Sequence, residues 1–553
     1  MNRAITQSWT LKKTSYRITV LITLAVCGLP LFNMSWMAIS HWTPDVFDWR
    51  VLKAAGNSLT LAIAATFFSI VIGTLSGFIL GRTNLPFKKR LKTILLYPYI
   101  VPPFITAIGW VVLANPKVGL LTSWIPGINI YTMEGLVFVE TLYWYTYVLL
   151  NVMNVLENMD GSLEESARMC GAGPVRIFRT VTLPLLTPTL VASGLIVFLC
   201  TISSFGVPAI IGNPGKVYVL TTTIISLIRS AELNQAMTLS LPVIVFAFGL
   251  IYFSETWFGK KAYATLTGKH NRKLEINLRA WRWPVLIAFL AFAFMAIVLP
   301  CGTIFLNSLL PHYGKWDVFY DLSGLGSGDG LSLVLAYFKR LFANYIVVLS
   351  GPIYLESIKN SFGLAFGGAI LLTVLSFFIA YFKEKTRYRF TKLLSTLSTL
   401  PYATPGTVLA LAIYSSFIGY DPLPLLMLAY VAKYLSHGVK VMAPAIINVD
   451  KSLEEAALMC GAKWGRTLTS VWLPLLKGTI STSIFLMAAP LFSELTMSVL
   501  LADDTFPTIG QKLFKLQEYE NPTHALVLSV VILIFIVGLN RTVKKLSRGR
   551  LGV

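Results

Sequence analysis

The sequence predicts an all-α membrane protein with about twelve transmembrane helices, arranged as two homologous six-helix halves. Hydrophobic residues make up 55% of the chain and charged residues 13%, which excludes a soluble protein of ordinary composition. Apolar runs long enough to cross a hydrocarbon core of about 30 Å recur along the whole chain. A polar segment of 25 residues occurs twice, at 162–186 and at 452–476, with fifteen identical positions.

Twelve apolar runs have the length of about 20 residues that a membrane-spanning helix needs. Polar or charged segments separate them, and the tenth run is the most polar because it contains Lys433, His437 and Lys440. The expected spans are 17–40, 58–80, 93–114, 135–156, 187–211, 236–258, 284–308, 360–382, 393–416, 424–446, 477–500 and 523–541.

The chain carries a formal net charge of +21. Such a charge could indicate nucleic-acid binding, but in a membrane chain it is typical of the bias of Lys and Arg toward cytoplasmic loops. If the spans alternate, 33 of the 46 basic residues fall on the side that holds both repeated segments. We therefore expect both termini and both repeated segments to be cytoplasmic, with lipid and no nucleic acid as partners.

The repeat continues outside the two polar segments. Pro98-Tyr99 and Pro401-Tyr402 lie 303 residues apart, whereas the polar segments lie 290 residues apart. The first half therefore holds 13 more residues between these points, which we assign to a loop around 115–135. Both copies have the same orientation, so we expect a parallel repeat about an axis along the membrane normal, with halves 1–283 and 284–553.

Two external segments, 41–56 and 311–359, are longer than a tight turn. The second contains four glycines between 324 and 330, whose spacing differs from that of a nucleotide-binding loop. We expect the apolar-rich stretch 331–349 to form a short helix on the outer surface, because a structureless loop of this length is uncommon. A merely solvated connection is the alternative.

Each repeated segment is predicted to begin with a short helix. Ser162 and Ser452 stand where they could cap this helix. Glu165 and Glu455 follow three residues later, as in a capping box, in which each side chain bonds the other residue's backbone N–H.

A turn and a second helix are expected to follow. Gly171 and Gly461 fit the turn, where a positive φ is not unfavourable for glycine, and Pro174 suits an early helical position. Pro184 and Pro474 are expected to mark the return into the membrane. Two interfacial helices that bind nothing are the alternative. Surface loops normally diverge, so the near identity of these two within one chain favours a binding role.

Both segments resemble the EAA loop of permease subunits from binding-protein-dependent ABC importers, with Ser166 as a minor departure. The resemblance covers essentially the whole chain and implies a fold like that of type I ABC importers. Each loop is then a coupling helix seated in a groove of an ATP-hydrolysing subunit, where its glutamate contacts basic groups. The residues that this resemblance assigns to coupling are Glu165, Ala167, Gly171, Leu183, Pro184, Glu455, Ala457, Gly461, Leu473 and Pro474.

The same resemblance implies the partners and the location. They are two copies of a cytoplasmic ABC ATPase and one periplasmic or extracellular solute-binding protein, at a bacterial inner (plasma) membrane. The chain is expected to be a transport subunit that is no enzyme and binds no cofactor, since ATP and Mg²⁺ belong to the ATPase. Its segment Gly212–Lys216 lacks the leading glycine and the following Ser or Thr of a phosphate-binding loop.

Segments 203–221 and 493–501 resemble those of ferric-iron importer permeases, so we expect Fe³⁺ as the cargo. A phosphonate or phosphorylated small molecule, or thiamine or sulfate, is the alternative for the same importer type, and Lys433 and Lys440 would suit an anion. Charges inside apolar spans tend to face a cavity or a partner, which would make them a polar lining of the translocation path. Pairing between helices or snorkelling to an interface explains these charges equally well. The candidate pathway residues are Glu140, Lys433, Lys440 and Glu494.

The spans contain no evident cluster of carboxylate, His or Cys ligands, so no metal site is expected in them. Selectivity for iron would then lie mainly in the external binding protein, docked on 41–56 and 309–359. An ion-coupled secondary transporter is the alternative of a different class. It predicts broken helices and carboxylates at matching depths, whereas the strongest repeat here lies in the loops. A membrane enzyme would need convergent polar groups, and the five histidines are scattered.

Overall fold

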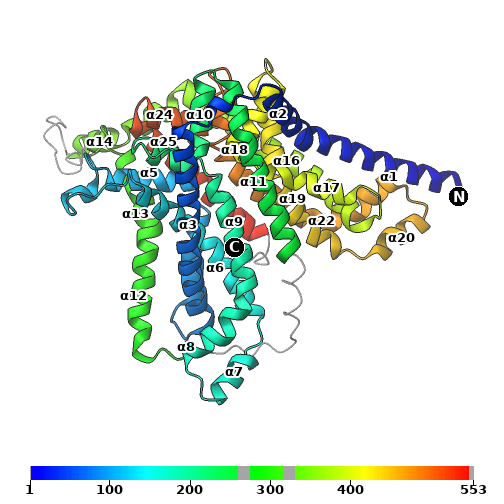
Figure 1. The fold of residues 1–553 in the computed structure, drawn as a ribbon, viewed down its shortest axis with the longest axis horizontal. Helices are drawn as coiled ribbons and strands as arrows, with labels where there is room; N and C mark the ends of the chain where they lie inside the picture. The colour runs from blue at the N-terminus through cyan, green and yellow to red at the C-terminus, as the bar shows by residue number, and fades with distance from the viewer. Residues whose placement is uncertain (1, 259–274, 315–329, 547–553) are drawn as a thin grey trace.

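A computed structural model describes residues 2–258, 275–314 and 330–546 (Figure 1). These residues are almost entirely helical and contain no β-strand beyond an isolated bridge between Thr83 and Ile276. The prediction of an all-α fold is confirmed.

The first half contains the following helices, where η marks a 3-10 or π turn: α1 (Asn2–Thr23), η1 (Leu24–Gly28), α2 (Leu29–Ser40), α3 (Trp49–Arg82), α4 (Lys88–Leu96), η3 (Tyr97–Tyr99), α5 (Pro103–Ala114), α6 (Met133–Asn158), α7 (Ser162–Met169), α8 (Pro174–Ile177), η5 (Phe178–Thr182), α9 (Leu183–Ile202), η6 (Pro208–Gly212), α10 (Leu220–Arg229) and α11 (Leu233–Phe258).

The second half contains α12 (Arg282–Ala293), η8 (Phe294–Val298), α13 (Leu299–Ser308), α14 (Gly330–Leu341), α15 (Ala343–Ser350), α16 (Pro352–Lys385), α17 (Thr391–Ala403), α18 (Gly406–Ser416), α19 (Pro422–Ile447), α20 (Lys451–Met459), α21 (Trp464–Thr467), η10 (Leu468–Trp472), α22 (Leu473–Phe492), α23 (Ser498–Leu501), α24 (Ile509–Glu518) and α25 (Pro522–Leu546).

The sequence repeat is also a structural repeat. Helices α3 and α16 both have 34 residues, and α6 and α19 both have 26. The run α8–η5–α9 matches α21–η10–α22, again with equal lengths of 29 residues. The stretch 331–349 is helical as expected but forms two helices, α14 and α15, and exposed Leu335 and Phe338 are accompanied by basic residues at the end of α14.

Among the described residues, nine helices are long and apolar enough to span a membrane, and a bent pair makes a tenth. That pair corresponds to the expected span 93–114, which is broken by a bend of 92° between Tyr99 and Pro103. The span 393–416 is likewise split, into α17 and α18. The expectation of two continuous spans here was wrong, because proline removes a backbone donor and disfavours helical geometry in the residue before it. The span 424–446 is the single helix α19, whose basic residues keep it below the hydropathy of the others.

Two other spans begin earlier than predicted. The helical run that replaces 187–211 is Pro174–Ile202, and the run that replaces 477–500 is Trp464–Phe492. Pro184 and Pro474 do not mark the helix starts, because each lies in a continuous helical run just after a π turn. A π turn changes the hydrogen-bond register, so a proline can follow it without ending the helix.

The first helices of the two halves are exchanged. Helix α1 contacts α16, α17 and α21, and α2 contacts α18, all of the second half. In return α12 contacts α4, and α13 packs against α5 of the first half. Leu286 and Phe289 of α12 thus share a hydrophobic cluster with Leu91 and Leu95 of α4.

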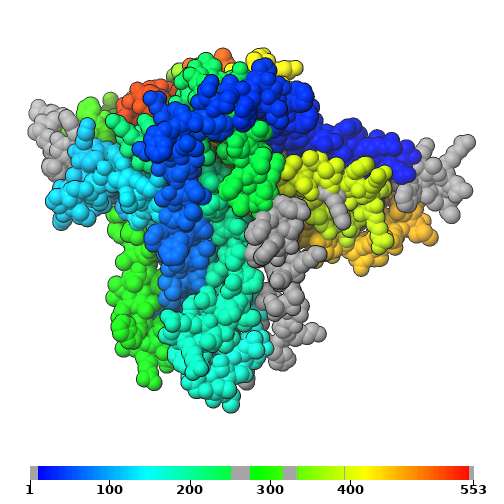
Figure 2. Space-filling model, in the orientation of Figure 1, coloured from blue at the N-terminus to red at the C-terminus, as the bar shows by residue number. Residues whose placement is uncertain are grey.

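The molecule has two arms (Figures 1 and 2). One contains α3, α6, α9 and α12 and carries α7 at its end, and the other contains α16, α17, α19 and α22 and carries α20. The arms meet where α10, α18, α24 and α25 gather, so the two repeated loops lie far from this junction and apart from each other. We call this meeting point the junction of the arms.

Candidate functional site

The two repeated loops have the predicted helix, glycine turn and helix. Gly171 and Gly461 adopt φ values of +82° and +80°. In the first loop the N–H of Ala172 donates to the carbonyl of Ala167 at 3.0 Å, which closes the helix with a Schellman-type bond. Ala457 accepts the equivalent bond in the second loop at 3.0 Å. These alanines and glycines therefore set the angle between the two short helices.

The predicted capping box is wrong. In the first loop Asp160 accepts from the backbone N–H of Ser162 at 3.0 Å and from its hydroxyl at 2.8 Å. In the second loop Asp450 is the N-cap and accepts from the N–H of Ser452 at 2.8 Å. An aspartate two residues earlier thus accepts from the serine N–H that a capping box would pair with the glutamate side chain, and this hydrogen bond lowers the pKa of the Asp450 carboxyl.

The glutamates of the two loops divide into a buried and an outward-facing set. Glu165 is half-buried, and the Glu455 side chain is 62% exposed, 3.5 Å from Lys451. The preceding residues, Glu164 and Glu454, are buried. Successive helical residues point about 100° apart, so one glutamate faces the transmembrane helices and the next faces outward. Sequence reasoning missed the buried set, although it is identical in both copies.

Each loop also presents an apolar face. Met169 and Met459, which occupy the same repeat position, are 90% and 88% exposed. Leu163 and Leu453 are exposed one to two turns earlier. Exposed methionine and leucine beside an outward-facing glutamate make a surface that suits a protein partner.

The other predicted loop residues lie inside the long helical runs, directly after their π turns. Leu183 and Pro184 open α9 directly after η5, and Leu473 and Pro474 open α22 directly after η10. Leu183 is half-buried and Leu473 is exposed. These residues therefore follow the change of hydrogen-bond register within each run that leads away from the loop.

A polar cluster lies between the halves, at the far ends of α9 and α22. Both helices stop there, and the segments 203–207 and 493–497 that follow face each other, with Gly206 close to the Leu495 side chain. Glu494 accepts from the Tyr434 hydroxyl at 2.6 Å and from the N–H of Met497 at 3.2 Å. Irregular backbone inside a membrane protein occurs where it is buried in protein or lines a cavity.

Glu140 lies in the same cluster but belongs to the first half. One of its oxygens accepts from the Trp144 indole at 3.1 Å, and the other is buried with no hydrogen-bond partner among the described residues. Ser204, which occupies the position equivalent to Glu494, lies beside it. The two halves thus each bring one carboxylate to their helix break, the first from α6 and the second from the break itself.

The two candidate lysines lie beside Tyr402 on the second half. Lys433 donates to the Tyr402 carbonyl at 3.3 Å and also to the carbonyl of Thr404, where α17 ends. Lys440 stacks over the Tyr402 ring at 5.3 Å. An ammonium group at a helix C-terminus satisfies carbonyls that lack helical partners. Lys433 therefore holds the break between α17 and α18.

Two tyrosine side chains lie between the two carboxylates. Tyr143 lies near Glu140 and near Tyr434, and Tyr434 bonds Glu494. The described residues contain no group of three or more His, Cys, Asp or Glu that could hold a metal ion. The structure thus brings Glu140, Glu494 and Lys433 into one cluster.

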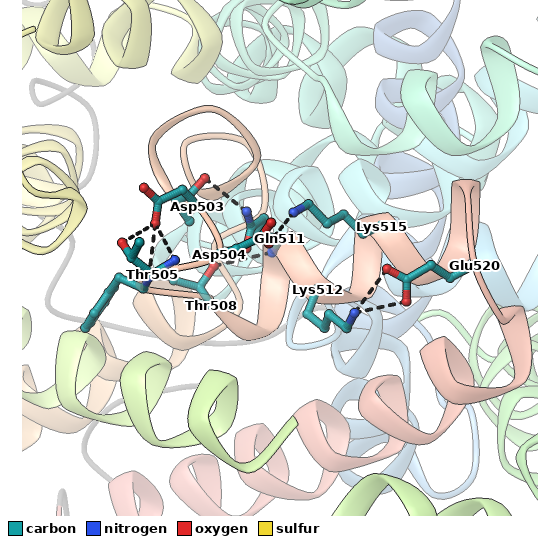
Figure 3. A network of polar contacts seen from close by, with 10 residues as sticks. Asp503, Asp504, Thr505, Thr508, Gln511, Lys512, Lys515 and Glu520 are labelled. Carbon is teal, nitrogen blue, oxygen red and sulfur yellow. Dashed lines mark hydrogen bonds and ion pairs between the residues drawn. The ribbon is translucent and has the colours of Figure 1, made fainter. Parts of the chain in front are cut away.

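A second polar network orders the backbone at the junction of the arms (Figure 3). Asp503 accepts from the N–H and the hydroxyl of Thr505 at 2.8 and 2.6 Å, which lowers the pKa of its carboxyl. Lys515 of α24 pairs with Asp504 at 2.7 Å. Arg229, at the end of α10, donates to the Tyr519 hydroxyl at 2.7 Å and so links the two halves.

Broken helices and a carboxylate in each half are the features that a secondary transporter was expected to show, so geometry alone does not separate the two transporter classes. Comparison with known proteins does. The family described as binding-protein-dependent transport system inner membrane component matches twice, at residues 69–299 and 373–544. The first match covers most of the first half and continues to residue 299, and the second lies within the second half.

Several relatives match over both halves. A protein of Haemophilus influenzae named for ferric transport is 26% identical over 78% of this chain and 68% of its own length. One of Actinobacillus pleuropneumoniae, named a ferric transport system permease, is 25% identical over 78% of this chain and 62% of its own length. One of Sinorhizobium fredii, named a probable ABC transporter permease, is 26% identical over 82% of this chain and 80% of its own length. The chain belongs to the family of inner membrane components of binding-protein-dependent transport systems.

Proposed function

We propose that this chain forms the path by which an ATP-driven importer carries ferric iron into the cell. The observation that carries the proposal is the match to two permeases named for ferric transport, each over 78% of this chain and across both halves. An external solute-binding protein would deliver the iron, and two ABC ATPase subunits would use ATP and Mg²⁺. The chain itself needs no cofactor for this role.

The polar cluster supports a cation as the cargo. Carboxylates and phenol oxygens are the ligands that hard cations prefer, and Glu140, Tyr143, Tyr434 and Glu494 supply them. Lys433 would suit an anion, but its ammonium group is engaged by two backbone carbonyls. A phosphonate cargo is therefore the weaker alternative. The cluster would bind iron transiently on its way through the membrane.

The loops support coupling to two ATPase subunits. Each lies at the end of its own arm and presents an exposed methionine, Met169 or Met459, beside an outward-facing glutamate. With the loops and both termini in the cytoplasm of a bacterial cell, the junction of the arms faces outward. A binding protein would then dock near α10, α14 and α24.

The cargo can be tested in proteoliposomes that contain the chain, its cognate ATPase and its cognate binding protein. We expect ATP-dependent accumulation of radiolabelled Fe³⁺ and none of 2-aminoethylphosphonate. Glu140→Gln and Glu494→Gln should each lower the rate about tenfold, since each removes a carboxylate that the proposal assigns as a ligand of the cation. Glu134→Gln, on the exposed start of α6, is the matched control. Accumulation of the phosphonate without iron would overturn the proposal.

Coupling can be tested in the same vesicles. Replacement of both Glu165 and Glu455 by Lys should abolish transport while leaving the chain folded in the membrane, because the new charges repel basic groups on the ATPase. Each single variant serves as a control and should retain partial activity. Normal transport by the well-expressed double variant would contradict the coupling assignment.

A further inference from the structure

The two loops are attached to the transmembrane helices by their buried glutamates. Glu164 and Glu454 occupy the same repeat position, and their side chains are only 1% and 7% exposed. A buried carboxylate needs a cation and hydrogen bonds to offset its lost hydration. The partners of these two glutamates therefore decide what holds each loop in place.

The first loop is held by its own half. The Arg82 guanidinium, at the end of α3, lies 2.9 Å from the Glu164 carboxylate, and its side chain is fully buried. Thr182, at the end of η5, donates to the same carboxylate at 2.7 Å. Glu164 thus joins α7 to α3 and to the run that leads into α9.

The second loop takes its cation from a distant part of the chain. The Lys12 ammonium of α1 lies 2.8 Å from Glu454, and the Tyr381 hydroxyl of α16 donates to the same oxygen at 2.7 Å. Lys12 also lies over the Tyr381 ring at 5.1 Å. The indole N–H of Trp464, in the second loop, donates to this hydroxyl at 3.2 Å.

The second half lacks the two partners that Glu164 has in the first half. The residue at one equivalent position bonds elsewhere, and the residue at the other cannot donate a hydroxyl hydrogen bond. Lys385 stands where the first half has Arg82, but it donates to the carbonyl of Val449 at 2.7 Å. Trp472 stands where the first half has Thr182 and cannot supply the hydroxyl donor. Lys12 is therefore the cation that pairs with Glu454 in the part of the chain the structure describes.

Helix α1 is fixed on the second half by aromatic contacts near Lys12. The Tyr16 ring meets Phe382 at 5.3 Å and Tyr388 at 4.6 Å. Its hydroxyl accepts from the N–H of Phe390 at 3.2 Å. Since Tyr16 follows Lys12 by four residues, both side chains lie on one face of α1.

We propose that α1 is the tether of the second loop, with Lys12 as the positioning residue that holds Glu454. The first loop is anchored within its own half, whereas the second depends on a helix that crosses over from the other half. The two loops are thus alike in sequence and unlike in support. A change in α1 reaches the second loop alone.

The tether can be tested on the full chain in nanodiscs by hydrogen–deuterium exchange. Lys12→Met should speed exchange of the backbone amides of α20 about tenfold, because loss of a buried charge-assisted bond favours local opening. Exchange of the α7 amides should not change. Lys13→Met is the matched control, since Lys13 is the exposed neighbour on the same helix.

Rescue separates this contact from a general loss of packing. Lys12→Arg should keep α20 protected, and the exchanged pair Lys12→Glu with Glu454→Lys should restore most of the protection that either single change removes. Unchanged exchange of α20 in folded Lys12→Met, or equal effects of Lys12→Met and Lys13→Met, would overturn the tether. None of these measurements needs the ATPase or the cargo, so they stand apart from the proposed function.

The consequence for transport rests on the proposed function. In vesicles with ATPase and binding protein, Lys12→Met should raise the ATP hydrolysed per ion imported at least twofold, because one of two loops then transmits poorly. A purely structural role would lower protein yield and leave this ratio unchanged. An unchanged ratio beside increased α20 exchange would keep the contact but overturn its role in positioning the loop for coupling.

Discussion

Removal of Arg82 should loosen the first loop strongly, and the size of the effect follows from burial. Arg82 and Glu164 are 2.9 Å apart with 0% and 1% side-chain exposure. Arg82→Met leaves the carboxylate buried with Thr182 as its remaining partner. Breaking a buried pair by removing one member costs about 3–5 kcal/mol, because the other charge stays desolvated.

Removal of both charges should destabilise the first loop far less than removal of Arg82 alone. The terminal nitrogens Nη1 and Nη2 of Arg82 are buried with no hydrogen-bond partner among the described residues, so the pair is already incompletely satisfied. Replacement of an incompletely satisfied buried pair by neutral groups of similar volume is often neutral or stabilising. We therefore expect Arg82→Met with Glu164→Gln to lie within about 1 kcal/mol of the parent chain, and since either single change costs about 3–5 kcal/mol, the coupling energy should be at least about 5 kcal/mol.

A double-mutant cycle measures these values. Local opening free energies of α7 come from hydrogen–deuterium exchange of the chain in nanodiscs, with α20 as the internal reference. Stability of the whole chain comes from unfolding in mixed micelles of mild and denaturing detergent. If Arg82→Met leaves α7 as protected as in the parent chain, or if the two single effects simply add, the reasoning from buried charge is refuted.

Three other changes are expected to act locally. Gly461→Ala places a side chain at φ +80° and should lower the local opening free energy of α20 by about 1 kcal/mol. The measurement is faster amide exchange in α20, and unchanged exchange would exclude backbone strain at this position. Asp450→Ala should speed amide exchange in the same helix, because it removes the N-cap acceptor of the Ser452 N–H. The pKa of Asp450 is lowered by its bond to the Ser452 N–H, so this contribution is complete above the ordinary carboxyl pKa of about 4 and lost as pH falls through the lowered value; a loss already at pH 7 would contradict the sign. Arg229→Met removes the bond to Tyr519 and should raise ATP hydrolysis in vesicles without binding protein, since it loosens the junction of the arms; an unchanged basal rate would show that this contact does not close it.

Features with a local cause could be predicted from the sequence. The glycine turns at Gly171 and Gly461 follow from a left-handed backbone that glycine adopts readily. The apolar runs follow from the thickness of the membrane, and the parallel repeat follows from self-similarity. The breaks near Pro98 and Pro401 also had a local signal, since each lies in a proline-rich turn of the sequence. Apolar composition alone predicts a continuous span there, whereas proline interrupts it.

Features that depend on distant partners could not be predicted. Glu164 and Glu165 have the same chemistry, and only the packing of α7 decides which of them is buried. The cation for Glu454 lies 442 residues away, at Lys12, in a helix that begins before the first expected span and continues into it. Sequence spacing carries no information on such a contact, because the exchange of first helices between halves is a property of tertiary packing.

The long helices explain how movement of a loop could reach the polar cluster. The run from Pro174 to Ile202 is continuous for 29 residues and ends one residue before the break that faces Glu140, and Trp464 to Phe492 does the same toward Glu494. At 1.5 Å per residue each run is about 43 Å long. A rotation of about 10° about the loop end would therefore move the break by about 7 Å. On the proposed function, a rigidly tethered loop converts ATPase closure into a displacement large enough to open the path. If the tether is loosened, the loop moves without its helix and the displacement does not reach the break.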